Sequence, residues 1–174
     1  RALYECVDEL SNWYVRRCRE RYWGIDMTDD KVAAYMTLYT CLVTLSKTAA
    51  PMIPFMADDI YRNLVCSVDK NAPISVHLCS FPEVDETLID KELEDNMKKV
   101  VDIVVLGRAA RNGANIKNRQ PLSTLYVKAD GAVGLGSFYT DIIRDELNVK
   151  EVKVVDDMSA LSSYSFKPNL KTVG

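Results

Sequence analysis

The segment "SNWYVRRCRERYWG", residues 11–24, combines the periodicity of a helix with a dense cluster of charge and aromatic rings. It contains both tryptophans of the chain, Trp13 and Trp23, and between them four arginines that a single glutamate opposes. Together with the residues before it, the segment predicts a helix over 2–21, because apolar side chains recur at steps of three and four. That apolar stripe consists of Leu3, Val7, Leu10, Tyr14 and Cys18. The arginines spread over the outer surface of this helix, and Gly24 is expected to end it.

Two more helices are predicted in the next 45 residues. One begins at Thr28, an N-cap type of residue, and continues to about residue 50. Its expected buried face consists of Val32, Tyr35, Met36, Tyr39, Leu42, Val43, Ser46 and Ala49. The other, "FMADDIYRNLV" over 55–65, follows two prolines and carries Met56, Ile60 and Leu64 inward. A short extended segment, "ISVHLCSF" over 74–81, is expected to follow.

A fourth helix is predicted over 86–114, and its character changes from acidic to basic along its length. Its apolar face consists of Leu93, Met97, Val100, Val101 and Val104. Arg108 and Arg111 near its end suit the helix dipole, which is a structural reason for both residues. Beyond residue 115 the pattern predicts strands at 121–129, 149–157 and 162–168 and a helix at 138–147.

The predicted fold is therefore mostly α: a four-helix bundle followed by a small α/β subdomain. Residues 1–84 hold the first three helices and the extended segment, residues 85–115 the fourth helix, and residues 116–174 the α/β part.

Composition indicates an ordinary globular protein, with 48% hydrophobic and 27% charged residues in 174. The longest apolar-leaning run, over 32–46, is shorter than the roughly 20 residues that a membrane span needs. No secretory signal is visible. Five cysteines without a C-x-x-C pair argue against disulfides and zinc and favour a reducing, cytoplasmic location.

The net charge of −3 conceals two basic islands. Residues 11–23 carry four arginines against one glutamate, or +3, and residues 107–128 carry five basic residues and no acid, or +5. Residues 83–95 carry seven acids and one lysine, or −6. Basic islands in an acidic chain are typical of a local footprint for a polyanion, although each is also compatible with a solvated face.

No catalytic site is predicted. His77 is the only histidine and has no evident cysteine or serine partner, so a structural role is expected. "GAVGLG", residues 131–136, lacks the strand–turn–helix context of a phosphate loop and is expected to be a turn. We find no metal-ligand cluster and no nucleophile beside a base, and we expect no cofactor.

Arginines interleaved with aromatic rings are typical of proteins that bind single-stranded RNA, where bases stack on rings and cations meet phosphates. The predicted contacts in the first island are Arg16, Arg17 and Arg19 at phosphates, with Trp13 or Trp23 for stacking. A second contact is predicted at Lys117 and Arg119, with Arg108 and Arg111 behind them. For Trp13, a position at the edge of the core is the alternative.

Five stretches resemble a known family. "LSNWYVRRCRERYWG" (10–24), "LSKTAAPMIPFMADDIYRNL" (45–64) and "SVHLCSFPEVDE" (75–86) resemble class I aminoacyl-tRNA synthetases of the isoleucyl, valyl and leucyl branch. "LGRAARNGANIKNRQPLSTLYV" (106–127) and "SFKPNLKTVG" (165–174) are most similar to the isoleucyl-tRNA synthetases.

This resemblance implies a four-helix anticodon-binding bundle, an α/β junction, and isoleucine tRNA as partner through its anticodon stem-loop. It also implies that the catalytic and editing domains of the same chain lie outside an excised, non-catalytic piece. The family's ATP with Mg²⁺, and zinc in some members, would belong to those other parts, and a monomer is expected.

Alternatives stay open at this point. One is the anticodon domain of a valyl or leucyl enzyme. Another is a structural bundle that packs on the catalytic body with little RNA contact, which a large exposed apolar patch would favour.

Overall fold

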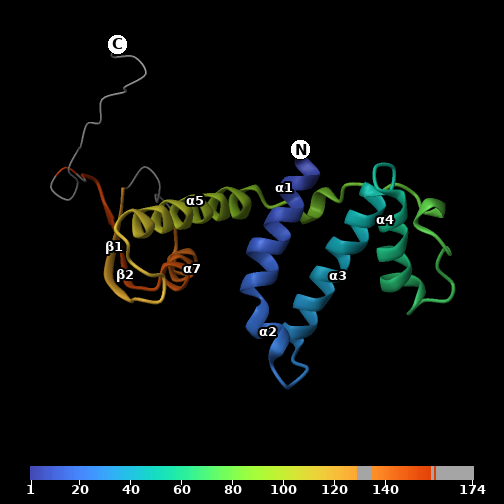
Figure 1. Ribbon diagram of the computed structural model, residues 1–174, viewed down its shortest axis with the longest axis horizontal. Coiled ribbons are helices and arrows are strands. Elements are labelled where there is room, and N and C mark those ends of the chain that lie inside the picture. The colour runs from blue at the N-terminus through green and yellow to red at the C-terminus, as the bar shows by residue number, and fades with distance from the viewer. Residues whose placement is uncertain (129–134, 158, 160–174) are drawn as a thin grey trace, which may run out of the picture. The chain divides into compact units, whose positions relative to one another are not determined.

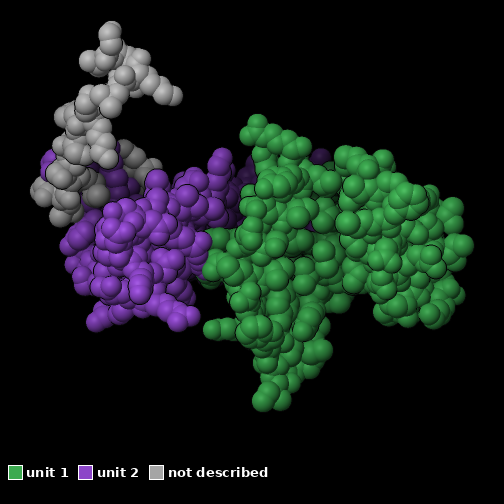
Figure 2. Space-filling model, in the orientation of Figure 1, with its two compact units in different colours: residues 1–85 green, residues 86–174 purple. Residues whose placement is uncertain are grey.

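The computed structural model describes residues 1–128, 135–157 and 159. The chain forms two compact units, residues 1–85 and residues 86–174 (Figure 2). The first unit is helical, and the second combines helices with a two-stranded parallel sheet. This confirms the predicted fold class, a mostly helical chain with a small α/β part. The predicted strand over 162–168 and most of "GAVGLG" lie outside the described residues.

The arginine-rich segment forms the second half of one long helical rod. α1 (Ala2–Glu9) continues through a π-helical segment, Leu10–Val15, and then into α2 (Arg19–Trp23), as Figure 1 shows. The backbone departs from helical geometry at Cys18, where ψ is 2°. The predicted helix over 2–21 is confirmed, and it ends at Gly24. Trp23, expected beyond the helix end, is instead its last residue.

α3 (Asp29–Ala49) begins where the sequence predicts it. The Thr28 hydroxyl accepts a hydrogen bond from the backbone N–H of Lys31 (3.2 Å), which satisfies one of the unpaired donors of the first turn. Asp29 and Asp30 in that turn complement the positive end of the helix dipole.

α4 (Pro54–Tyr61) continues as a π-helical segment, Arg62–Cys66. The helix is confirmed, but its predicted inward face is wrong at Met56, which is 64% exposed. Ala57 and Tyr61, one residue further along the helix, are buried instead. They pack with Ala50 and Val76 to form the core cluster of the first unit. The small Ala57 side chain permits close approach of α3, whereas a methionine there would not fit.

The segment over 74–81 is not continuously extended as predicted, because Val76–Leu78 form a 3₁₀ turn, although Ser75 and Cys79 on either side of it are extended. The Asp58 carboxylate, on α4, accepts hydrogen bonds from the Ser75 hydroxyl (2.6 Å) and the Val76 N–H (2.9 Å). Burial of Val76 at this anchor turns the chain toward α4. His77 is exposed in this turn.

The second unit begins with a 3₁₀ turn, Glu86–Leu88, and α5 (Lys91–Gly113). α5 begins five residues later than predicted, because the side chain of Asp90 accepts from the Leu93 N–H and caps it. Val100 and Val104 are buried as predicted, whereas Leu93 is 44% exposed. α5 packs on α7 within this unit, so its predicted place in a bundle with the first three helices stays a prediction.

The strand–helix–strand prediction is confirmed by β1 (Leu122–Lys128), α7 (Ser137–Leu147) and β2 (Val149–Val155). The strands are parallel, with Leu122 opposite Val149. Their crossover helix, α7, buries Ile142, Ile143 and Leu147. This small layer of helix on sheet packs on α5 and positions the loop that connects α5 to β1.

Candidate nucleic-acid interface

The first basic island is built around tryptophan rings. The guanidinium carbons of Arg16 and Arg17 each lie 5.7 Å from the ring centre of Trp13, which is half-buried. Arg16 also donates from Nε to the carbonyl of Asn12 (2.9 Å). The electron-rich ring face attracts both cations and holds them near one another on the helix surface.

Trp23 is 74% exposed at the end of α2, and the guanidinium of Arg19 lies 5.4 Å from its ring centre. This exposure fits the prediction that Trp23 offers a stacking surface. We call Trp13, Arg16, Arg17, Arg19 and Trp23 the arginine–tryptophan surface.

The fourth arginine of the segment has a different role. Arg21 forms a two-pronged pair with Asp30, from Nε and Nη2 at 2.7 Å each, and Nη2 also reaches the Asp30 carbonyl. The pairing raises the pKa of Arg21 and lowers the pKa of the Asp30 carboxyl. Because Asp30 lies in the first turn of α3, the pair joins α3 to α2, the helix that carries Arg19 and Trp23.

Tyrosines make further contacts between this helical rod and α3. The hydroxyls of Tyr14 and Tyr22 both donate to the Ala34 carbonyl, at 3.2 and 3.5 Å, and the Tyr22 ring lies 4.9 Å from that of Tyr35. Burial raises the pKa of Tyr22. Helix periodicity marked Tyr14 as inward-facing, but its acceptor on α3 could be known only from the fold.

The second basic island is only partly a surface. Arg111 is 4% exposed, and its guanidinium donates to the backbone carbonyls of Lys117, Gln120, Leu147 and Asn148. We therefore exclude it from the candidate interface, although the sequence suggested it. Arg111 lies in the last turn of α5, where the sequence predicts a favourable interaction with the helix dipole, and its guanidinium also binds the C-terminal carbonyls of α7.

Arg108 donates to the carboxylate of Glu146, whose side chain is 6% exposed. This pair engages Nη2 of Arg108, whose side chain is 37% exposed. Lys117 and Arg119, by contrast, are exposed on the loop between α5 and β1. Three of the five basic side chains of the second island are therefore exposed, Lys117, Arg119 and Lys128, and the first two lie on this loop.

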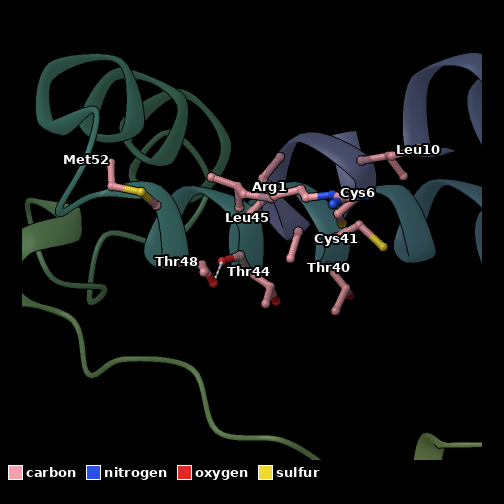
Figure 3. Close-up of a pocket in the computed structure, with 11 residues that line it drawn as sticks. Arg1, Cys6, Leu10, Thr40, Cys41, Thr44, Leu45, Thr48 and Met52 are labelled. Atoms are coloured by element: carbon pink, nitrogen blue, oxygen red, sulfur yellow. Dashed lines mark hydrogen bonds between the residues drawn. The ribbon is translucent and has the colours of Figure 1, made fainter. Parts of the chain in front are cut away.

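An apolar groove runs between α1 and α3 in the first unit (Figure 3). Its volume is about 680 Å³, and Cys6 from α1 and Leu10 from the following π-helical segment face Cys41 and Leu45 from α3. Burial raises the pKa of Cys41, and the nearby Cys6 adds to the shift.

The predicted buried faces of α1 and α3 are only partly buried. Tyr35, Met36 and Tyr39 are 36% exposed or more, as are Val7 and Val32. Periodicity identifies which side of a helix is apolar, but it does not say whether a partner covers that side within the same unit.

Three further predictions from the sequence concern disulfides, metal sites and membrane-spanning helices. All five cysteines are free thiols. Among the described residues no three histidine, cysteine or acidic side chains gather as a metal site. Within the same residues, no helix has the length and apolarity to cross a membrane.

The fold agrees with the comparison to protein families. The chain belongs to the anticodon-binding domains of tRNA ligases, whose family model matches residues 1–126. Among curated relatives it is similar to the isoleucine–tRNA ligase of Clostridium acetobutylicum, with 57% identity over 172 residues, 99% of this chain and 16% of that protein. The isoleucine–tRNA ligase of Clostridium novyi is 54% identical over 99% of this chain and 16% of that protein. Isoleucine–tRNA ligase 2 of Bacillus cereus is 44% identical over the whole chain and 16% of that protein. The chain thus spans 16% of the length of these relatives.

Proposed function

We propose that this chain is the anticodon-binding part of an isoleucine–tRNA ligase and binds the anticodon stem-loop of isoleucine tRNA. The arginine–tryptophan surface is the observation that carries the proposal, because it gathers cations and an exposed indole in the second half of one helical rod. The names of the relatives support isoleucine over valine or leucine as the amino acid.

The binding mode follows from the chemistry of these side chains. Arg16, Arg17 and Arg19 meet phosphates, and the exposed face of Trp23 stacks on an unpaired base of the loop. Trp13, with two guanidinium groups at its ring, keeps Arg16 and Arg17 in place. Bound in this way, the tRNA directs its acceptor end toward a catalytic domain elsewhere in the full-length chain.

The remaining parts of the proposal concern the whole protein. Its ligase activity, with ATP and Mg²⁺, belongs to other domains, as does any zinc, and this part needs no cofactor. We expect a cytoplasmic monomer in which the catalytic and editing domains are covalent neighbours.

The double variant Arg16→Ala with Arg17→Ala tests the surface. We expect it to retain its helical circular dichroism and to bind isoleucine tRNA about tenfold more weakly at about 0.1 M salt. Loss of two phosphate contacts should also make the slope of log affinity against log salt shallower by about 1.4. A fluorescence titration at several salt concentrations measures both quantities.

Lys91→Ala with Lys98→Ala is the matched control, since it removes the same charge from α5. Equal weakening by both double variants would mean that only net charge matters. Unfolding of the arginine variant would make those arginines structural. A tRNA with replaced anticodon bases should bind more weakly than isoleucine tRNA, and equal binding would contradict recognition of the anticodon.

The groove between α1 and α3 favours a second role for this part, as a docking surface for the rest of the ligase. Its lining is mostly apolar, and both helices also carry exposed apolar side chains, such as Tyr4 at 75% and Met36 at 55%. Apolar surfaces of this kind mark sites of protein contact. The chain's 16% share of its relatives leaves ample polypeptide to cover it.

A further inference from the structure

The loop between α5 and β1 is held from inside by two side chains. The backbone carbonyls of residues 117 and 120 accept from Nη1 of Arg111, at 3.0 and 2.9 Å. The carbonyls of residues 118 and 119 accept from Nδ2 of Asn148, at 3.2 and 3.0 Å. All four consecutive carbonyls of the 117–120 loop therefore bind donors from the protein beneath it.

Both donors are themselves fixed. Arg111 is 4% exposed and also binds the carbonyls of Leu147 and Asn148 at the end of α7. Asn148 caps α7 in the left-handed conformation, with φ of 48°. The loop is thus tied to the ends of two helices that pack on each other, α5 and α7.

This arrangement has an electrostatic consequence. Carbonyl oxygens carry partial negative charge and would repel a phosphate at the loop surface. Here a guanidinium and an amide engage these four oxygens, while the side chains of Lys117 and Arg119 are exposed. A basic loop with its carbonyls occupied needs no reordering to accept an anion, which lowers the entropic cost of binding.

We propose that Arg111 and Asn148 are positioning residues that hold the 117–120 loop as a preformed contact for RNA phosphates, made by Lys117 and Arg119. The inference rests on the proposed function, because the RNA is the tRNA that the arginine–tryptophan surface binds. It gives the buried Arg111 a role in RNA binding although the RNA never touches it.

Asn148→Gly is the informative variant. Glycine adopts φ of 48° without strain, so the substitution removes the two side-chain hydrogen bonds and keeps the backbone conformation of the cap. Asn115→Gly is its matched control, because Asn115 also has positive φ (56°) and its side chain does not bind the loop. Arg119→Ala measures the contact itself, and Arg119→Ala with Asn148→Gly measures their coupling.

The experiment uses the full-length ligase that carries this chain and follows two readouts. The first is amide hydrogen exchange over the 117–120 loop, and the second is the affinity for isoleucine tRNA. We expect Asn148→Gly to raise exchange in the loop and weaken binding about threefold. Arg119→Ala should weaken binding about fivefold, and the double variant should be little weaker than Arg119→Ala alone. Asn115→Gly should change neither readout.

The outcomes separate this inference from the proposed function. Faster exchange in Asn148→Gly with unchanged affinity would overturn the inference, as would unchanged affinity in Arg119→Ala. Two other results would contradict the proposed function: unchanged tRNA binding by Arg16→Ala with Arg17→Ala, or unchanged binding of a tRNA with replaced anticodon bases. Additive losses in the double variant would also contradict the positioning role, because they would mean that Asn148 acts apart from Arg119.

Discussion

At the scale of single residues, the arginines of this chain differ in what holds their guanidinium groups. Arg21 is held by a carboxylate at the surface, and Arg111 is held by backbone carbonyls in the interior. Arg19 instead lies over an indole. An aromatic face attracts the guanidinium plane without using its N–H edge, which stays available for a bidentate phosphate contact. This difference separates Arg19 from Arg21 and Arg111.

Asp58 leads to a prediction about pH. Hydrogen bonds from the Ser75 hydroxyl and the Val76 N–H lower the pKa of its carboxyl, with smaller help from Arg62 and His77. A lowered folded pKa means that the carboxylate stabilises the fold above its unfolded pKa of about 3.9. That contribution is lost as the pH falls through the folded pKa.

We therefore expect Asp58→Asn to be less stable than the parent at about pH 7 and to approach it at about pH 3. Urea unfolding midpoints at the two pH values measure this difference. Asp59→Asn is the control, since Asp59 is exposed next to Asp58. A constant difference between Asp58→Asn and the parent across this pH range would show that the carboxylate charge does not act as described.

At the scale of elements, the contact between α5 and α7 depends on the absence of a side chain at Gly107. A Cβ added at Gly107 would lie 2.4 Å from Cδ1 of Leu147, which is buried. The two helices come this close because residue 107 is a glycine. Leu147 is the last residue of α7, and its carbonyl accepts a hydrogen bond from Arg111. The contact between Gly107 and Leu147 therefore also sets the position of the loop that Arg111 binds.

Gly107→Ala should lower the free energy of unfolding by about 1 to 2 kcal/mol, because overpacking outweighs the gain in helix propensity. Gly113→Ala, in the same helix with open space around it, should be neutral or slightly stabilising. Chemical denaturation compares the two variants. Adding Leu147→Val to Gly107→Ala should recover part of the loss, and no recovery would mean that the contact with Leu147 is not the cause.

At the scale of the whole molecule, the docking role proposed for the groove between α1 and α3 predicts different effects of substitutions in the isolated chain and in the full-length ligase. Met52 lines the groove and is 63% exposed, and Val68 is 81% exposed away from it. In the isolated chain, Met52→Glu and Val68→Glu should each change stability by less than about 0.5 kcal/mol, since both sites are exposed.

In the full-length ligase, Met52→Glu should destabilise while Val68→Glu stays neutral, because a docked partner would bury the new charge. Thermal unfolding of both variants in both proteins makes the comparison. If Met52→Glu behaves alike in the isolated chain and in the ligase, the groove is not covered, and the docking role fails.

Much of this architecture follows from local patterns. Helix periodicity, the Thr28 cap and the strand patterns at 122–128 and 149–155 depend on neighbours within a few positions, so the helices and the two strands were predictable, whereas the parallel pairing of the strands was not. The arginine–tryptophan surface was predictable for the same reason, since its members lie within 11 residues on one helical rod.

Long-range contacts decided the rest. The sequence predicted Arg111 as a helix-dipole residue behind a possible RNA contact, but two of its four acceptors lie 36 and 37 residues away in sequence and could not be predicted. The inward face of α4 depends on Ala50 at the end of α3. The turn at Val76–Leu78 depends on Asp58, which lies on α4. A periodic pattern reports which side chains favour burial, whereas the partner that buries or binds them is defined only when distant segments pack together.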